Sequence, residues 1–381
     1  MHTAGLFCSL QSSLVDLQPV TARRKQTISI GDKLKSNISR REFLRRLAAL
    51  GLGTVASSWL LNACGIEQRP EPTYVEPTRS PWVPTAVPSA TPAPTTVSSA
   101  TAAPTPTPGL EYPHIAVARG GEPEQLVRRA IAALGGMERF VRSGDDVIVK
   151  PNICAGYHTY EYATTSNPWV VAELVRLCLA AGARRVRVMD SPFGSGPEQA
   201  YAVSGIQEQV LAAGGEMEIM SRFKFVATDI PEGLSLRQKE IYQDILTADL
   251  VINVPIAKHH NLGRLTLGMK NLMGVITDRP QMHAQLGQRL ADLTSRIRPA
   301  LTVVDAVRIL LRHGPTGGSL DDVKQLDTVI ASPDIVAADS YAATLFGIDP
   351  TALGFVRAGT AMGLGRSDLD NLTIEEIAVG Q

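Results

Sequence analysis

Short apolar runs alternate with longer segments of helical periodicity between residues 114 and 381. The run at residues 250–255 is continuously apolar, which is typical of a strand buried on both faces of a parallel sheet. Glycine and proline turns separate the segments, so strands and helices are expected to alternate along the chain. The pattern predicts an α/β fold in which helices flank a mainly parallel open sheet, with a small antiparallel excursion at residues 223–236.

Capping and turn residues set most of the predicted boundaries. Asn167 before Pro168 is typical of a helix start, and Gly182 is expected to end that helix. Ser332 is predicted to cap a helix that Pro333 begins. Strands are predicted at residues 115–119, 147–149, 185–189, 216–220, 250–254, 301–304 and 328–331. Further helices are predicted at residues 122–134, 205–213, 241–248, 265–275, 288–297, 353–364 and 373–377.

Residues 1–65 carry the pattern of an export signal. Residues 39–45 (SRREFLR) form a twin-arginine motif, and the apolar residues 47–61 follow it. Cys64 follows residues 61–63 (LNA) in a sequence that resembles the lipobox of bacterial lipoproteins. We therefore expect export by the twin-arginine machinery, lipidation of Cys64 and an extracytoplasmic location at a membrane. The alternatives are a basic amphipathic helix on a cytoplasmic protein, and cleavage that leaves Cys64 as a free thiol.

Residues 66–113 are dominated by Pro, Thr, Ser and Ala. Too few large apolar side chains are present to offset the entropy of ordering a core. We expect a disordered, extended linker here and a single α/β domain at residues 114–381.

Charge and cysteine usage narrow the classes of partner and cofactor. The chain has 37 basic and 37 acidic residues, so no nucleic-acid partner is indicated, because such partners usually leave a basic patch. Cys154 and Cys178 are the cysteines of the expected domain, and there is no CxxC motif. We therefore expect no cysteine-ligated iron-sulfur cluster. A disulfide between Cys154 and Cys178 remains open, since sequence does not fix their geometry.

Polar residues follow four of the predicted strands. In open parallel sheets, ligands bind beyond the carboxyl ends of the strands, so these residues are expected to converge on one site. Alternatively, each one simply caps a helix or makes a turn. His260 would face away from its neighbour in extended chain. The strand-end residues are Lys150 with Asn152, Asp190 with Ser191, Lys258 with His259, and Asp305.

These segments together resemble the domain of unknown function 362 family, over most of residues 114–347. The family name assigns no reaction, and some of its members carry iron-sulfur cysteine motifs that this chain lacks. The resemblance supports the domain and the expected site. It is carried by residues 144–152, Thr164, Thr165, Pro168, residues 190–192, residues 249–255, Lys258, His259, Thr266, residues 269–271, Gly274, Asp305, Gly314 and Pro315.

The side chains of these segments suggest an anion site. Three lysines and the helix start after Asn167 would offer positive charge and free backbone N–H groups to a phosphate or carboxylate. A solvated surface charge is the alternative for each lysine. The expected ligand-binding residues are Lys150, Asn152, Thr164, Thr165, Ser191, Lys258, Lys270 and Asn271.

Acid–base or metal chemistry is expected at the carboxylates and histidines. Asp190, His259 and Asp305 are the candidate catalytic residues. Asp190, Asp305, Asp339 and His283 are candidates for a divalent metal. The histidines have no fixed ligand spacing, so satisfied or exposed polar roles stay open for them.

The sequence leaves three functions open. The first is an exported, lipid-anchored enzyme that acts on a small anionic substrate. The second is a noncatalytic lipoprotein that binds an anion or a metal. The third is an accessory subunit of a membrane redox complex.

Overall fold

The computed structural model describes residues 112–380. The twin-arginine motif, Cys64 and nearly all of the expected linker lie outside these residues. Within residues 112–380, no helix has the length and apolar character that crossing a membrane requires.

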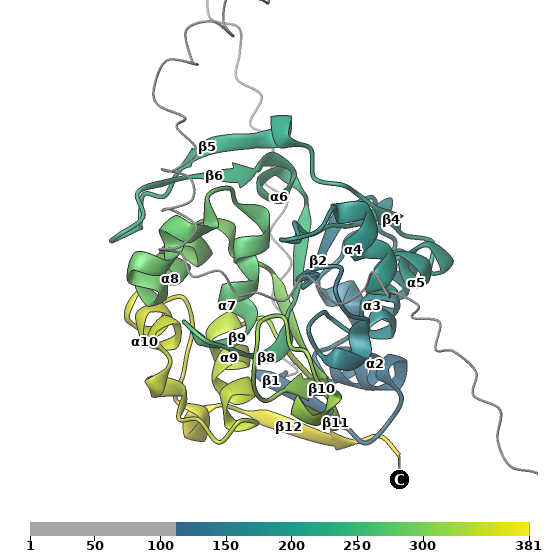
Figure 1. Ribbon diagram of the computed structural model, residues 1–381. Helices are drawn as coiled ribbons and strands as arrows, with labels where there is room; N and C mark the ends of the chain where they lie inside the picture. Colours follow the sequence, from purple (N-terminus) through teal and green to yellow (C-terminus); the bar gives the residue numbers. More distant parts are fainter. Residues whose placement is uncertain (1–111, 381) are drawn as a thin grey trace, which may run out of the picture. The chain divides into compact units, whose positions relative to one another are not determined.

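The described part of the chain is an α/β structure built on one mixed, mostly parallel sheet (Figure 1). Its main path runs in the order β12-β1-β11-β10-β7-β2-β3-β4, and β8 and β9 extend it beside β10. β11 is antiparallel to both of its neighbours, β1 and β10. The strands are β1 Ile115–Arg119, β2 Asp146–Pro151, β3 Arg185–Val188, β4 Glu216–Met217, β7 Leu250–Val254, β8 Ile256–His260, β9 Arg264–Thr266, β10 Leu301–Leu310, β11 Val323–Ser332 and β12 Ile374–Ala378.

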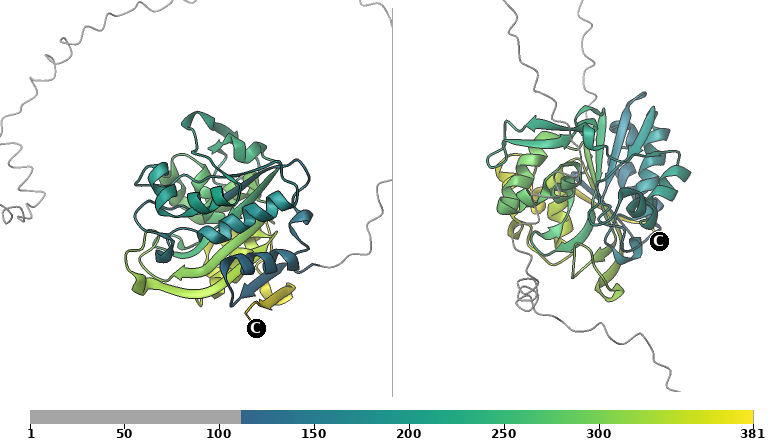
Figure 2. Two further views of the ribbon diagram at one scale, coloured as in Figure 1. Left: turned by 90° about the vertical axis from the view of Figure 1, so that its right-hand side faces the viewer. Right: turned by 45° about the horizontal axis from the view of Figure 1, so that its top comes forward.

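Helices cover both faces of this sheet. Figures 1 and 2 show α2 to α5 on one side and α7 to α10 on the other, with the strands between them. Each side has its own apolar core, and the alternating side chains of the central strands contribute to both. The helices are α2 Pro123–Ala133, α3 Pro168–Ala180, α4 Pro197–Val203, α5 Ile206–Ala212, α6 Gln243–Thr247, α7 Gly268–Asn271, α8 Leu286–Ile297, α9 Ile335–Thr344 and α10 Gly354–Ala361.

The predicted antiparallel excursion is confirmed as a separate two-stranded sheet, but its second strand lies beyond the predicted range of residues 223–236. It pairs β5 (Phe225–Asp229) with β6 (Gln238–Tyr242). The helix predicted at residues 241–248 is correspondingly shorter, because Ile241 and Tyr242 pair with β5 and only Gln243–Thr247 is helical. The strand predicted at residues 216–220 is also shorter and covers Glu216–Met217.

The helix start predicted at Asn167 is confirmed. The Asn167 side chain accepts a hydrogen bond from the backbone N–H of Trp169, and Pro168 occupies the first turn of α3. The cap predicted at Ser332 is wrong. Asp334 caps α9 by accepting from the N–H groups of Val336 and Ala337, whereas the Ser332 hydroxyl accepts from the backbone N–H of Asp334.

Two other predictions differ from the strands of the main sheet. Residues 373–377 were expected to be helical, but β12 is a strand parallel to β1. So short a segment gains little as a helix, and pairing with the open edge of β1 satisfies its backbone groups. The strand predicted at residues 301–304 continues to Leu310, because β10 pairs with β11 along both strands. Asp305 therefore lies within a strand and not at its end.

Candidate functional site

A cavity of about 790 Å³ lies at the carboxyl ends of β2, β3 and β8. Its volume is in the usual range for small-molecule sites. The parallel strands β7, β2 and β3 end at the same edge of the sheet, which is where ligands bind in such folds. The polar side chains that line the cavity include Lys150, Asn152, Asp190, Lys258, His260, Thr266, Lys270, Asn271, Arg279 and His283.

Lys150 and Asp190 form a buried ion pair in this lining. The amine of Lys150 lies 2.9 Å from Asp190 Oδ1 and also donates to the Pro151 carbonyl. Asp190 accepts two further hydrogen bonds, from the backbone N–H groups of Ile153 and Ser191. Burial lowers the pKa of Lys150 to about 8, although Asp190 opposes this shift. The pair therefore holds an ammonium group and a carboxylate together in a region from which most water is excluded.

Gly274 is required beside this ion pair. A Cβ atom at residue 274 would lie 1.9 Å from Asp190 Oδ1 and 2.6 Å from Lys150 Nζ. Contacts this short force movement of the pair or of the backbone. The backbone of Gly274 also accepts a hydrogen bond from Ser191 N–H, so it joins the loop after β3 to the segment after α7.

Asn271 ties α7 to the ends of β2 and β7. Its Oδ1 accepts from the amine of Lys150 and from Nδ2 of Asn152, both at 2.9 Å. Its Nδ2 donates to Oδ1 of Asn253, at 2.8 Å. Since both ends of the amide are used within the protein, Asn271 acts as a positioning residue for the lysine beside it.

Lys258 extends from β8 and is held by main-chain oxygens. Its amine donates to the carbonyls of Thr164 and Pro315, at 2.6 and 3.1 Å. Burial lowers the pKa of Lys258. Thr164 thus acts through its backbone, and the Thr165 hydroxyl donates to the Asn152 carbonyl. Both threonines therefore hold neighbouring residues of the site in place through hydrogen bonds.

Lys270 lies on α7 and has the least satisfied amine of the three lysines. In the part of the chain that the structure describes, its contact within hydrogen-bond range is the sulfur of Met273, at 3.8 Å. Burial, followed by the charge of Lys258, lowers the pKa of Lys270 to about 8. The N-terminus of α7 is fixed by Asp339, which accepts from the N–H groups of Gly268 and Met269.

The structure places His260 on the cavity, while His259 lies against another loop. Nδ1 of His259 accepts from the backbone N–H of Gly314. Nδ1 of His260 accepts from the N–H groups of Leu262 and Gly263, both at 3.1 Å. Burial, followed by the charge of Lys270, lowers the pKa of His260 to about 3. His260 is therefore a neutral imidazole whose proton is on Nε2.

The charge of the lining is predominantly positive. Lys150, Lys258, Lys270 and Arg279 contribute four cationic side chains, whereas the carboxylates of the lining are those of Asp190 and Asp278. Arg279 donates to the Ser191 carbonyl, at 2.5 Å, so it is anchored at the cavity wall. This imbalance suits an anionic ligand.

Two residues of the lining carry unpaired polar atoms. Among residues 112–380, the Thr266 hydroxyl and Oδ1 of Asn152 are buried without a hydrogen-bond partner. Buried polar atoms are almost always paired in proteins, so these two atoms are exceptions among the residues of the lining.

The four candidate metal residues do not come together. Within residues 112–380, no cluster of three or more His, Cys, Asp or Glu side chains is arranged to hold a metal ion. Asp190 is committed to Lys150, and Asp339 caps α7. Asp305 accepts from the backbone N–H groups of Asn167 and Val307 in the interior. Of this set, Asp190 and His283 line the cavity.

Burial changes the titration of the two interior carboxyls. It raises the pKa of Asp305 to about 6 and that of Asp339 to about 7, although backbone N–H groups oppose both shifts. Cys154 and Cys178 are both free, so they form no disulfide with each other. Burial raises the pKa of the Cys178 thiol to about 12.

Sequence reasoning did not select His260 or Arg279. The choice between adjacent histidines depends on which face of β8 turns to the cavity, and a shift of one residue inverts it. Arg279 begins a 3₁₀ helix, Arg279–Gln285, that returns to the site from a loop. The one feature of the sequence that pointed to Arg279 was its position shortly after the polar cluster of residues 258–274.

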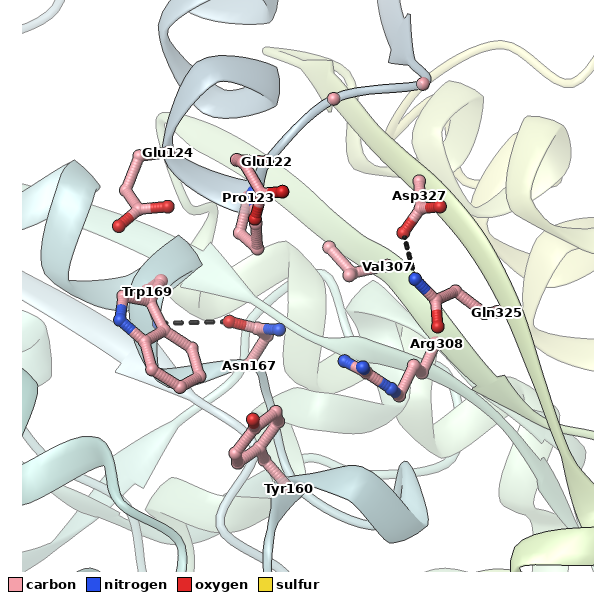
Figure 3. A pocket seen from close by; sticks show the side chains of 12 residues that line it. Glu122, Pro123, Glu124, Tyr160, Asn167, Trp169, Val307, Arg308, Gln325 and Asp327 are labelled. Carbon is pink, nitrogen blue, oxygen red and sulfur yellow. Dashed lines mark hydrogen bonds between the residues drawn. The ribbon is translucent and has the colours of Figure 1, made fainter. Parts of the chain in front are cut away.

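A second cavity, of about 440 Å³, lies beside the N-terminus of α2 (Figure 3). Figure 3 shows Trp169, Tyr160 and Arg308 around it, and the Arg308 guanidinium carbon is 5.6 Å from the Tyr160 ring centroid. Its lining carries one cationic side chain against the carboxylates of Glu122, Glu124 and Asp327. The first cavity, with its buried lysines, is therefore the candidate site for an anion.

Comparison with known proteins identifies relatives of the chain. It is 30% identical over 248 residues to the thylakoid-associated protein sll1697 of Synechocystis sp. (strain ATCC 27184 / PCC 6803 / Kazusa), covering 62% of this chain and 74% of the relative. It is 12% identical to the lactate racemase apoprotein of Thermoanaerobacterium thermosaccharolyticum, with a TM-score of 0.36, covering 56% of this chain and 53% of that structure. The chain thus spans about half the length of the racemase, and likeness at this level establishes no shared activity.

The family match covers the candidate site. The domain of unknown function DUF362 matches residues 147–344, a range that holds the buried lysines, Asp190, His260 and Arg279. Together with the cyanobacterial relative, this match is sufficient to assign the family. The chain belongs to the DUF362 family.

Proposed function

We propose that the protein binds a small anion, a carboxylate or a phosphate, in the lysine-lined cavity and converts it by acid–base chemistry. The observation that carries this proposal is the gathering of Lys150, Lys258, Lys270 and Arg279 around one cavity whose lining has two carboxylates. Burying ammonium groups is unfavourable unless they are paired. An anionic ligand would supply the missing negative charge.

The lysines also favour catalysis over binding alone. The pKa values of Lys150 and Lys270 are lowered to about 8, mainly by burial, so each amine can take up or release a proton near neutral pH. His260 offers a neutral N–H donor to a ligand oxygen. In a noncatalytic binding protein the same cavity would return its ligand unchanged.

We further propose that this site works outside the cytoplasm on a lipid-anchored protein. The twin-arginine motif at residues 39–45 and the lipobox-like Cys64 support export and anchoring. The name of the Synechocystis relative, a thylakoid-associated protein, fits attachment to a membrane. Metabolic labelling with a fatty acid, compared between wild type and Cys64→Ser, tests the anchor, and equal labelling of the two would contradict it.

Anion binding is tested by thermal unfolding with phosphate, citrate and acetate. A ligand present at 100 times its Kd stabilises the folded state by about 2.7 kcal/mol, so a clear rise in Tm is expected. Lys258→Gln should lose most of the rise, whereas the exposed Lys324→Gln is the matched control and should keep it. The rise should shrink with added NaCl. If none of the anions raises the Tm of the wild type, the proposal fails.

A further inference from the structure

The three buried lysines of the cavity differ in what their amines contact. Lys150 donates to Asp190, to Asn271 and to a backbone carbonyl, so three acceptors match its three N–H bonds. Lys258 donates to two backbone carbonyls. These acceptors hold the amines of Lys150 and Lys258 in place, so both are engaged by the protein itself.

Lys270 stands apart from both. The residue is 9% exposed, yet within residues 112–380 its amine forms no ion pair and has a thioether sulfur as its hydrogen-bond neighbour. The charges that act on its amine include those of Lys258 and Arg279, and both oppose protonation. Desolvation and neighbouring cations both favour the neutral form of a lysine amine, and the lone pair of the neutral amine can act as a nucleophile.

Building on the anion site proposed above, we propose that Lys270 forms an imine with the carbonyl group of a small oxo-carboxylate bound in the cavity. The carboxylate of this substrate would lie against Lys258 and Arg279. The carbonyl carbon would face the unpaired amine of Lys270. The substrate class follows from the placement of the Arg279 guanidinium and the Lys258 amine on the same cavity as one unpaired amine.

The covalent step balances without any further reactant. The Nζ lone pair forms a bond to the carbonyl carbon, and the C=O π pair moves to the oxygen. That oxygen takes one proton from the nitrogen and one from solvent, and it leaves as water. The product is a protonated imine, which withdraws electrons from the adjacent carbon–carbon and carbon–hydrogen bonds.

One further group of the lining can assist this step. The Nε2–H of His260 is the ring proton left free when Nδ1 accepts from the backbone. It can donate to the oxygen on which charge develops during attack.

The test is reductive trapping on the full-length protein. Pyruvate with sodium cyanoborohydride would reduce the imine to a stable secondary amine, and peptide mass mapping would locate the carboxyethyl group. We expect Lys270 to be modified first, and ahead of Lys150, whose amine is engaged by three acceptors. At pH 7 a lysine of pKa about 8 has roughly 300 times more neutral amine than one of pKa 10.5, so labelling about two orders of magnitude faster than at exposed Lys324 is expected.

The controls separate this inference from the anion site itself. Acetate, which has no carbonyl carbon open to amines, should compete with pyruvate and slow the labelling of Lys270. Lys270→Arg should abolish the fast adduct and still be stabilised by acetate. If anions stabilise the wild type but Lys270 is labelled no faster than Lys324, the imine is refuted and the anion site stands. If no anion binds at all, the proposed function fails as well.

Discussion

Replacing Asp190 by Asn tests the central ion pair of the site. The pair joins Lys150 Nζ to Asp190 Oδ1 at 2.9 Å, and the two residues are 1% and 3% exposed. Removing one partner of a buried pair typically costs about 3–5 kcal/mol. Asn can still accept from the backbone N–H of Ile153, so we expect a loss near the lower limit, about 3 kcal/mol, in the free energy of unfolding.

The pH dependence of this loss follows from the pKa of Lys150. Burial lowers that pKa from 10.5 to about 8 with Asp190 present. The unfolded chain therefore binds more protons than the folded one between these values, and stability rises with pH across this window. Without Asp190 the folded pKa falls further and the window extends toward neutral pH. The effect of Asp190→Asn should thus shrink by about 1 kcal/mol or more between pH 7 and pH 9.

Urea unfolding followed by circular dichroism at both pH values measures this loss. Asp370→Asn, at an exposed position, is the matched control and should change stability by less than about 0.5 kcal/mol. In the double variant Lys150→Met/Asp190→Asn, much of the loss should be recovered, because no unpaired charge remains. A loss below about 1 kcal/mol at pH 7, or one that grows toward pH 9, would refute the reasoning.

Three further predictions concern the walls of the cavity. Gly274→Ala should destabilise the protein by about 1–3 kcal/mol in urea unfolding, because its Cβ would lie 1.9 Å from a carboxylate oxygen, and Gly196→Ala, with 3.4 Å to its nearest atom, is the control. Burial raises the pKa of Asp339 to about 7, so the free energy of unfolding should fall as pH rises from about 4 to 7. In urea unfolding of Asp339→Asn, this pH-dependent fall should be absent. His260 should appear in nitrogen NMR spectra as the neutral Nε2–H tautomer at pH 5, and a protonated ring there would contradict its placement.

The gathering of Lys150, Asp190 and Lys258 could be anticipated from the sequence. Each follows or ends an apolar run, and parallel strands bring such residues to one edge of a sheet. Lys270 and Asn271 could be included because they follow shortly after in the same polar cluster. Local pattern was sufficient here because strand direction alone decides which edge these residues reach.

Other parts of the site depend on long-range pairing that local pattern does not encode. Asp305 seemed to close a strand, but β10 runs on beside β11, so its carboxylate binds backbone N–H groups in the interior. The face of β8 that turns inward is set by its pairing with β9 and β10, and this placed His260 on the cavity in place of His259. The β12 strand forms because β1 offers an open edge to a segment that is too short to gain much as a helix.

The most direct test of the account is an anomalous difference map from a crystal of the protein soaked in tungstate, a heavy oxyanion. The account predicts a peak inside the cavity at the ends of β2, β3 and β8, within hydrogen-bond reach of the amines of Lys258 and Lys270. Peaks confined to the exposed surface or to the second cavity would contradict the claim that the buried lysines form an anion site.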